Sequence, residues 1–491
     1  MSTKLTILLL LFSLTGCTVT NVIPGSSSLP KDRLNSKFAG TFETGKLYVG
    51  EKTGFYHSLA RGQRLVSDSS AEAYANRILK KLKKSSGVKN IPGKAYLTAR
   101  NYLGAEATAN GNIYIDYGTI DHLENEDQFA ALIAHELSHV ILNHHNSDVY
   151  LKYHKNAVRM SSILNQLKNK VDQIGSSGEK SSELSLVKHL TNSYLVADGA
   201  VFPIWTRKQE LEADSMALEL LTRTNYNVAG LKELFDKMEA NRKHAREQEE
   251  IRTKKRLAAA QKQGLKTLFS EVGKTFVKNI SIIMSNKHPS AETRKENIVE
   301  YMEKFEIDLD FPKEKVSSWN RVKKRSTTKS IVKSLTAVDE AASLIQSADI
   351  AQADKTLRAK GTVSSQPFSR IVKANLREVQ QKKSDAKYNL RIASQSKYSP
   401  FSVHLRSYEL SNRRSSDFNR LHRAFLKYQK PPNYYSSIIR YAKQNNRNTL
   451  ATTLQKECID KYALEEFSCI FVDSDSDGGL SFEKYISKLT G

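Results

Sequence analysis

The stretch Ala134-His135-Glu136-Leu137-Ser138-His139-Val140 decides the fold of this chain. It continues an apolar run, Phe129 to Ala134, which predicts the buried part of an α-helix. Residues four apart share one face of a helix, so His135 and His139 can reach a single metal ion, and imidazole nitrogen is a common zinc ligand. Glu136 would lie beside that metal, where a general base takes a proton from a zinc-bound water. The alternative is a helix with two chance histidines.

The residues after His139 argue against one class of zinc peptidase, the metzincins. His145 follows His139 by six residues, which is the spacing of the third metal ligand in metzincins. That class also needs glycine at the position of Leu142, so that the chain can turn back to the metal. We expect Leu142 to continue the helix and carry His145 away, and we interpret His144 and His145 as structural or surface histidines.

A third metal ligand is then expected from another helix, which we predict at residues 208–221. Glu210 and Asp214 lie four residues apart on one face of it. One carboxylate can complete a His-His-Glu zinc site, and the other can accept a hydrogen bond from the second nitrogen of a ligand imidazole. A solvated, acid-rich helix is the alternative.

These two stretches together resemble the gluzincin metallopeptidase family that includes HtpX and the CAAX prenyl proteases. The family pattern is a His-Glu-x-x-His helix and a later helix with Glu-x-Glu-Ala-Asp, here Glu210-Leu211-Glu212-Ala213-Asp214. The resemblance implies one zinc ion per chain, held by His135, His139 and Glu210, with Asp214 behind the ligands.

A further motif extends the resemblance, which covers about residues 65–305, to the exported branch of the family. His288-Pro289 is followed by Arg294, six residues after the histidine. In the similar periplasmic β-barrel assembly-enhancing branch this histidine approaches the zinc. The resemblance thus implies that His288 is a regulatory gate at the metal, with Arg294 nearby. A purely structural His-Pro at a helix start is the alternative.

The first residues predict export and lipid anchoring. A basic head and an apolar run too short to span a bilayer end in Leu14-Thr15-Gly16-Cys17, which resembles a bacterial lipobox. We expect residues 1–16 to be a signal peptide, Cys17 to carry lipid, and residues 17–60 to form a tether and N-terminal segment. Thr18 suggests the outer membrane, facing the periplasm. An ordinary secretory signal is the alternative.

The formal net charge of +24 indicates attraction to anionic surfaces. An exported lipoprotein does not meet nucleic acid, so no nucleic-acid partner is expected. An anionic membrane surface, lipopolysaccharide or an acidic partner fits better, and a merely well-solvated surface is the alternative.

Short β segments are expected before the zinc-site helix. Residues 94–99 read as a strand, and Asn110-Gly111 predicts a turn between two further strands. We expect an extended substrate to pair with an edge strand at Asn112 to Ile115.

The whole chain is predicted to have an α+β fold, with a mostly helical zincin-type metalloprotease domain and a small β-sheet at residues 61–305. A basic linker is expected at 306–335, and an all-α domain of tetratricopeptide-like repeats at 336–491. The repeat prediction rests on three prolines at spacings of 33 and 32 residues, Pro367, Pro400 and Pro432. An irregular helical bundle is the alternative.

Two features near the C-terminus each allow two interpretations. Residues 473–484 resemble an EF-hand loop, but Lys484 stands where a bidentate glutamate is needed. They are therefore either a weak calcium site or an acidic turn, with these candidate ligands: Asp473, Asp475 and Asp477. Cys458 and Cys469 either pair in an oxidising compartment or remain free thiols.

The leading hypothesis is a periplasmic zinc endopeptidase that degrades misfolded or stalled outer-membrane proteins or helps their assembly. The family resemblance implies that the helical repeats reach clients or the outer-membrane assembly machinery. The alternative is a periplasmic chaperone or assembly factor whose zinc site is mostly shut by His288.

Overall fold

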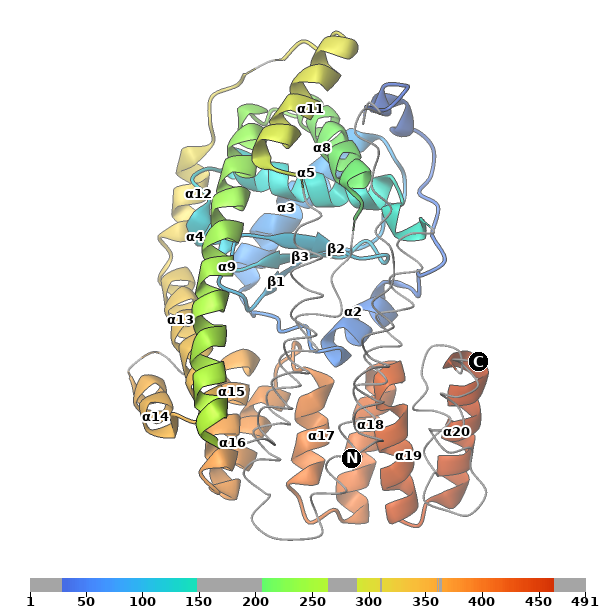
Figure 1. Ribbon diagram of the computed structural model, residues 1–491. Coiled ribbons are helices and arrows are strands. Elements are labelled where there is room, and N and C mark those ends of the chain that lie inside the picture. The colour runs from blue at the N-terminus through green and yellow to red at the C-terminus, as the bar shows by residue number, and fades with distance from the viewer. Residues whose placement is uncertain are drawn as a thin grey trace, which may run out of the picture.

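The computed structural model describes residues 29–147, 205–263, 289–309, 311–359, 361 and 364–462. They form a mostly helical N-terminal region around a small sheet and an all-helical C-terminal region of paired helices (Figure 1). The predicted α+β fold class is therefore confirmed. Several predicted features lie outside the described residues: the signal peptide at 1–16, Cys17, His288, Cys469 and the acidic turn at 473–484.

The sheet has three strands, β1 (Ala95–Thr98), β2 (Ala105–Ala107) and β3 (Ile113–Asp116), in the order β1-β3-β2. β3 is parallel to β1 and antiparallel to β2. The prediction of an edge strand at Asn112 to Ile115 was wrong, because β3 pairs on both sides. The open edge belongs to β2. The Asn110-Gly111 turn connects β2 to β3, which lies between β1 and β2, and Gly111 takes a positive φ of 74°.

Different helices cover the two faces of the sheet (Figure 1). The isoleucines of β3 share one apolar core with α3 (Ser69–Ser86) and α5 (Glu126–Ile141). Tyr114, between those isoleucines, belongs to a second core with α2 (Glu51–Ala60) and the C-terminal helices. This follows from the alternation of side chains along a strand. Part of the expected tether at residues 17–60 is thus a packed helix.

α5 is buried along almost its whole length, from Glu126 to Val140. The side chain of Asn125 caps its N-terminus by accepting from the N–H of Gln128. The expectation that Leu142 continues the helix was wrong: α5 ends at Ile141, and Asn143 takes the left-handed conformation at φ 52°. Asparagine tolerates that conformation, so the chain turns here without a glycine.

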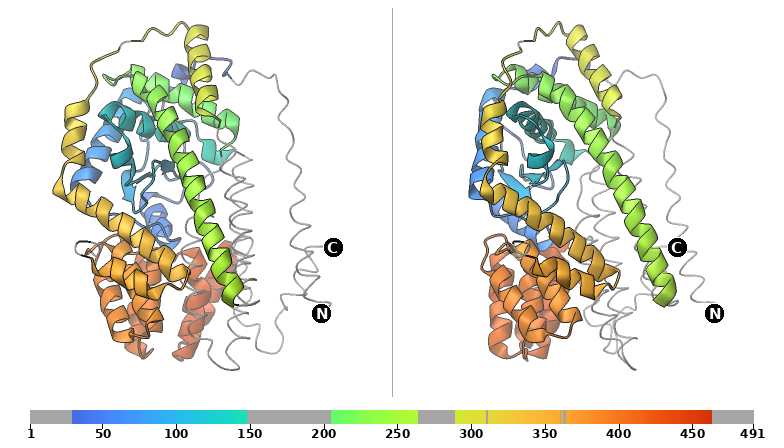
Figure 2. Two further views of the ribbon diagram at one scale, coloured as in Figure 1. Left: turned by 60° about the vertical axis from the view of Figure 1, so that its left-hand side comes forward. Right: turned by 90° about the vertical axis from the view of Figure 1, so that its left-hand side faces the viewer.

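Three more helices build the N-terminal region around α5, namely α8 (Arg207–Thr222), α9 (Ala229–Gln263) and α11 (Ala291–Lys304). Thr206 and Gln209 form a capping box that starts α8. Gly230 lets α9 approach α5 closely, since a Cβ there would lie 2.8 Å from the backbone of Asp127. α9 then runs on well past the sheet (Figure 2). The short helices of the region are η1 (Leu34–Lys37), α4 (Thr119–His122) and η2 (His144–Asn146).

Residues 306–335, expected to be a basic linker, contain α12 (Val316–Lys323) and the start of α13 (Ser326–Gln346). Trp319 of α12 is fully buried and donates its Nε1–H to the carbonyl of Leu123 at 2.9 Å. Its ring lies 4.8 Å from that of Phe129 on α5. The basic residues of this stretch lie mostly on the exposed side of helices whose inner side joins the N-terminal core.

α13 and the remaining helices form successive pairs (Figure 1). They are α14 (Ile350–Arg358), α15 (Pro367–Val379), α16 (Lys383–Ser394), α17 (Phe401–Glu409), α18 (Ser415–Lys427), η4 (Pro432–Tyr434), α19 (Tyr435–Gln444) and α20 (Asn448–Tyr462). Two apolar cores include residues of both regions: one extends from the N-terminal region as far as α15, and the other joins α2 to α17, α18, α19 and α20. Among the described helices, none is long and apolar enough to cross a membrane.

A regular turn joins the two helices of each pair. The turns between α13 and α14, α15 and α16, α17 and α18, and α19 and α20 each contain a non-glycine residue with positive φ, at Ala348, Gln381, Arg413 and Asn446. The spacings are 33, 32 and 33 residues, the same period as the three prolines. The structure thus contains helix pairs at a regular period, and their assignment as tetratricopeptide repeats stays a prediction.

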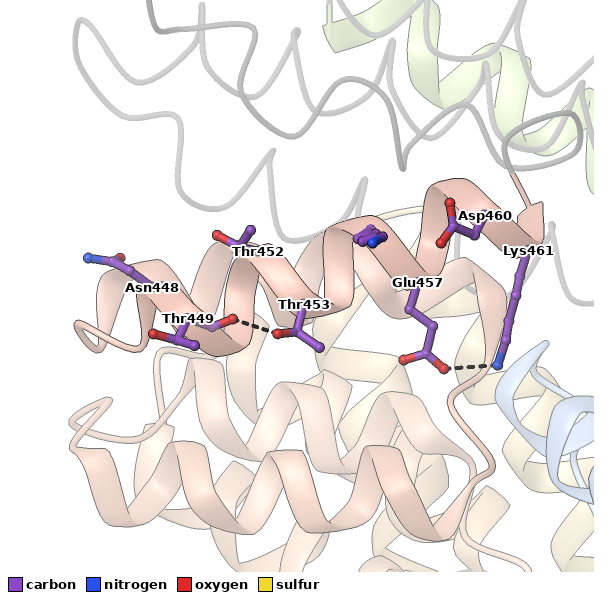
Figure 3. Close-up of a pocket in the computed structure, with 8 residues that line it drawn as sticks. Asn448, Thr449, Thr452, Thr453, Glu457, Asp460 and Lys461 are labelled. Atoms are coloured by element: carbon purple, nitrogen blue, oxygen red, sulfur yellow. Dashed lines mark hydrogen bonds and ion pairs between the residues drawn. The ribbon is translucent and has the colours of Figure 1, made fainter.

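The last described helix, α20, contains a buried cysteine and lines a pocket. Cys458 is buried and takes part in a disulfide bond, while Cys469, its expected partner, lies outside the described residues. An open pocket runs along α20 and is lined in part by Thr449, Thr453 and Glu457, of which Glu457 pairs with Lys461 (Figure 3). It is remote in the fold from α5 and α8 (Figure 1).

The buried position of Trp319 leads to a first prediction. Trp319→Ala should lower the free energy of unfolding by about 3–5 kcal/mol, because it leaves a large cavity between α12 and α5. Thermal and denaturant unfolding would measure this loss. Val316→Ala is the matched control, since Val316 lies exposed on the same helix. Equal effects of the two substitutions would contradict the packing of α12 on the core.

Candidate metal centre

α5 and α8 bring three side chains together inside the N-terminal region: His135, His139 and Glu210. One ligand atom of each lies within 4.8 Å of the others, and all three residues are buried. The two Nε2 atoms are 3.2 Å apart, and each lies 3.7 Å from an oxygen of Glu210. Among the described residues, this is the one cluster of His, Cys, Asp or Glu with such spacing.

The cluster fits a zinc ion by chemistry and by size. Two imidazoles and one carboxylate are the donor set of many catalytic zinc sites. With zinc–nitrogen bonds of about 2.0–2.1 Å, two tetrahedral ligand atoms are about 3.3 Å apart. The observed separations of 3.2 and 3.7 Å bracket that value. The three side chains are therefore placed to hold one metal ion.

His135 is held from behind by Asp214, four residues after Glu210 on α8. Asp214 Oδ1 lies 2.9 Å from His135 Nδ1, so the carboxylate keeps the proton on Nδ1 and leaves Nε2 to face the cluster. Burial works against an imidazolium, but the bond to Asp214 raises the pKa of His135 overall.

Asp214 is in turn neutralised by Arg294 of α11, which is fully buried. Its Nε and Nη2 donate to the two carboxylate oxygens at 2.7 and 2.6 Å. The guanidinium also lies over the ring of Phe235, 4.1 Å from its centroid. The structure thus brings Arg294 to the site, where it contacts the partner of a candidate ligand. His288, the proposed gate, lies outside the described residues.

His139 is enclosed by other rings. The indole of Trp205 stacks on it at 4.3 Å, with 14° between the planes, and His144 Nδ1 lies 2.9 Å from His139 Nδ1. Burial lowers the pKa of His139 well below the usual range, so the imidazole stays neutral, as a metal ligand must. His144 and His145 are both buried rather than at the surface, and the Nε2 of His145 lies 3.0 Å from the carbonyl oxygen of Ala107.

Glu136 lies between the cluster and the open edge of the sheet. Burial raises its pKa to about 7, and the nearby carboxylate of Glu210 adds to this. Its carboxylate accepts a hydrogen bond from the N–H of Ala107 on β2, while Oε2 has no hydrogen-bond partner among the described residues. A carboxylate with a pKa near 7 and one uncommitted oxygen suits a general base.

Sequence reasoning missed several residues that shape this centre. Trp205 and Phe235 cover the imidazole and guanidinium, and no local pattern marks them. Ala107 holds Glu136 through its backbone, which has no side-chain signal at all. The position of His144, five residues after His139, is a weak indication that the two histidines are close. Their contact depends on the left-handed turn at Asn143.

The matches with known proteins agree with this geometry. Residues 69–302, just under half of the chain, match the model of peptidase family M48. The chain is 28% identical to metalloprotease YcaL of Escherichia coli (strain K12) over 230 residues, which is 45% of this chain and 80% of YcaL. It is 30% identical to metalloprotease LoiP of the same organism over 141 residues, or 28% of this chain and 47% of LoiP.

A eukaryotic protein shows a similar match. The mitochondrial metalloendopeptidase OMA1 of Schizosaccharomyces pombe is 24% identical over 167 residues, or 34% of this chain and 44% of OMA1. The chain thus spans under half of LoiP and of OMA1. The predicted enzyme class is confirmed: the chain is a metalloendopeptidase, and the region that matches the M48 model holds a buried candidate metal site.

Metal content tests the cluster directly. Purified protein should carry about one equivalent of metal, and Glu210→Gln should lose most of it, because it removes one of three ligands. Elemental analysis after desalting measures both. Arg207→Gln, an exposed change on the same helix, serves as control. Full metal content in Glu210→Gln would exclude Glu210 as a ligand.

Proposed function

We propose that this M48-type metalloendopeptidase uses zinc to cleave misfolded or stalled outer-membrane proteins in the bacterial periplasm. The observation that supports zinc peptidase chemistry best is the cluster of His135, His139 and Glu210 beside a base at Glu136. The narrower assignment, to the β-barrel assembly-enhancing branch of the family, rests on the sequence motifs and on the helix pairs that follow the peptidase region.

The chain's own groups divide the work of hydrolysis. His135, His139 and Glu210 would hold zinc, which supplies a Lewis acid that polarises a water and the substrate carbonyl. Glu136 takes the proton of the attacking water and passes it to the leaving amine. The N–H of Ala107 holds the Glu136 carboxylate in place during both transfers. Asp214 and Arg294 keep His135 oriented.

An extended substrate would lie along the open edge of β2. The N–H of Thr108 donates to Asn112, and that of Asp116 donates to Gly104, so these residues point toward β3. Because antiparallel pairs alternate, the backbone groups of Ala105 and Ala107 point away from β3, toward the edge. Ala107 already contacts Glu136 and His145, so Ala105 is the residue that would pair with a substrate strand.

The proposed location is the periplasm, with a lipid anchor in the outer membrane at Cys17. Support comes from the lipobox-like sequence, and two of the similar metalloproteases are bacterial. The clients would be unfolded or misassembled envelope proteins, reached together with the outer-membrane assembly machinery through the helix pairs. Regular helix pairs build extended surfaces suited to such partners.

The C-terminal helix pairs would also contact an anionic membrane surface. The turns after α15, α17 and α19 lie together at the end of the array that faces away from the sheet (Figure 1). They present five exposed cations that form no ion pair with a carboxylate among the described residues: Lys382, Lys383, Arg413, Arg414 and Arg447. Each basic group near an anionic surface contributes about 1 kcal/mol.

Glu136→Gln tests the catalytic proposal. It should retain zinc but lower the rate of casein cleavage at least about 100-fold, because the general base is lost while the ligands remain. Cleavage and metal content are measured on the same preparation. Undiminished cleavage would contradict the mechanism. If the variant still corrects envelope defects in cells, the chaperone function is favoured instead.

A vesicle assay tests the membrane contact. In a Cys17→Ser background, which removes the proposed lipid, changing the five turn cations to glutamine should weaken binding to anionic vesicles at least tenfold at low salt. A control changes five exposed lysines of the N-terminal region to glutamine: Lys31, Lys37, Lys52, Lys80 and Lys84. Equal losses in both proteins would show that only net charge matters.

A further inference from the structure

A contact between two imidazoles lies behind the candidate metal centre. His139 Nδ1 and His144 Nδ1 are 2.9 Å apart, and both rings are buried. Two ring nitrogens at this distance form a hydrogen bond only if one carries the proton and the other presents a lone pair. The direction of that bond follows from what lies on the other side of each ring.

The groups that face Nε2 of His139 determine which of its ring nitrogens carries the proton. Its Nε2 faces Nε2 of His135 and an oxygen of Glu210, the position of a metal ion in the proposed zinc site. A metal needs the lone pair of Nε2, so the proton of His139 must sit on Nδ1. His139 therefore donates to His144, and His144 accepts through Nδ1.

The group that faces Nε2 of His144 determines where the second hydrogen bond goes. Having accepted at Nδ1, neutral His144 carries its proton on Nε2. That nitrogen lies 3.4 Å from Oε2 of Glu212 on α8. The proton donors thus run in one direction, from His139 to His144 and from His144 to Glu212.

We propose that His144 and Glu212 are positioning residues that hold His139 as a metal ligand. The inference rests on the proposed zinc site and assigns a task to the middle acid of the Glu210-Leu211-Glu212-Ala213-Asp214 stretch. Glu212 lies about 200° around the helix from Glu210, so it does not face the metal position itself. It acts through His144, while Asp214 acts directly on His135.

The turn after α5 makes this arrangement possible. Asn143, at φ 52°, reverses the chain so that the His144 ring returns to the helix end that carries His139. The carbonyl of His144 accepts from Gln209 Nε2 at 3.4 Å, which joins the turn to the start of α8. Trp205 stacks on the outer face of His139, so few other polar groups reach that imidazole.

Zinc affinity is the measurement that tests the proposal, since it requires no catalytic turnover. His144→Leu should weaken zinc binding about 10- to 100-fold, the usual cost of losing a group behind a ligand. Glu212→Ala should weaken it in the same direction by a smaller factor. His144→Gln, which still offers an acceptor and a donor, should recover most of the affinity. Dissociation constants come from competition with a chromophoric chelator.

Two controls separate positioning from folding. Circular dichroism and thermal unfolding of the zinc-free proteins identify any variant that fails to fold, and Arg207→Ala gives the effect of an unrelated change on α8. Co(II) substituted for zinc provides a second readout, because its visible absorption bands shift when His139 moves. A purely structural role of His144 would lower the unfolding temperature and leave the affinity and the cobalt spectrum unchanged.

The double variant decides whether the two residues act as a unit. His144→Leu with Glu212→Ala should bind zinc no more weakly than His144→Leu alone, because Glu212 acts only through His144. Multiplicative losses, or unchanged affinity in folded His144→Leu, would overturn the inference. Failure of the zinc site itself is distinguishable, since then wild type and Glu210→Gln would bind zinc equally poorly.

Discussion

The packing of α8 against α5 is the constraint on which the centre depends. Neither helix is a site alone, since α5 offers two histidines and α8 offers acids. Once packed, α8 places Glu210 against both imidazoles and Asp214 behind one of them. Burying this many ionisable groups is costly unless each has a partner. Arg294 offsets the charge of Asp214, and the other carboxylates lie beside imidazoles or backbone N–H groups.

The sheet is tied to the same centre through one residue of its edge strand. The N–H of Ala107 holds Glu136, and its carbonyl lies against His145. β2 therefore has two tasks, because it orients the base and leaves Ala105 facing the open edge. The other face of the sheet, at Tyr114, packs on α2 and the C-terminal helices.

The C-terminal helices are not separated from the peptidase region by a free linker. α12 inserts Trp319 beside Phe129, and the core continues through α13 into the helix pairs. Their turns repeat because each first helix ends in a left-handed residue that reverses the chain over a few positions. The cations at these turns face away from the sheet, so the proposed membrane contact would use a surface different from that of the metal centre (Figure 1).

The sequence by itself determined the helices of the centre and the types of its main groups. Apolar periodicity, the Asn125 and Thr206 caps and the four-residue spacings are local properties, and they placed His135, His139, Glu210 and Asp214 correctly on faces. Tertiary structure alone decided which strand is the edge, that α12 buries Trp319 against α5, and that His144 reaches His139. These depend on pairing order, on surfaces far apart in the chain and on one left-handed turn, because local patterns do not encode the partner that a face will meet.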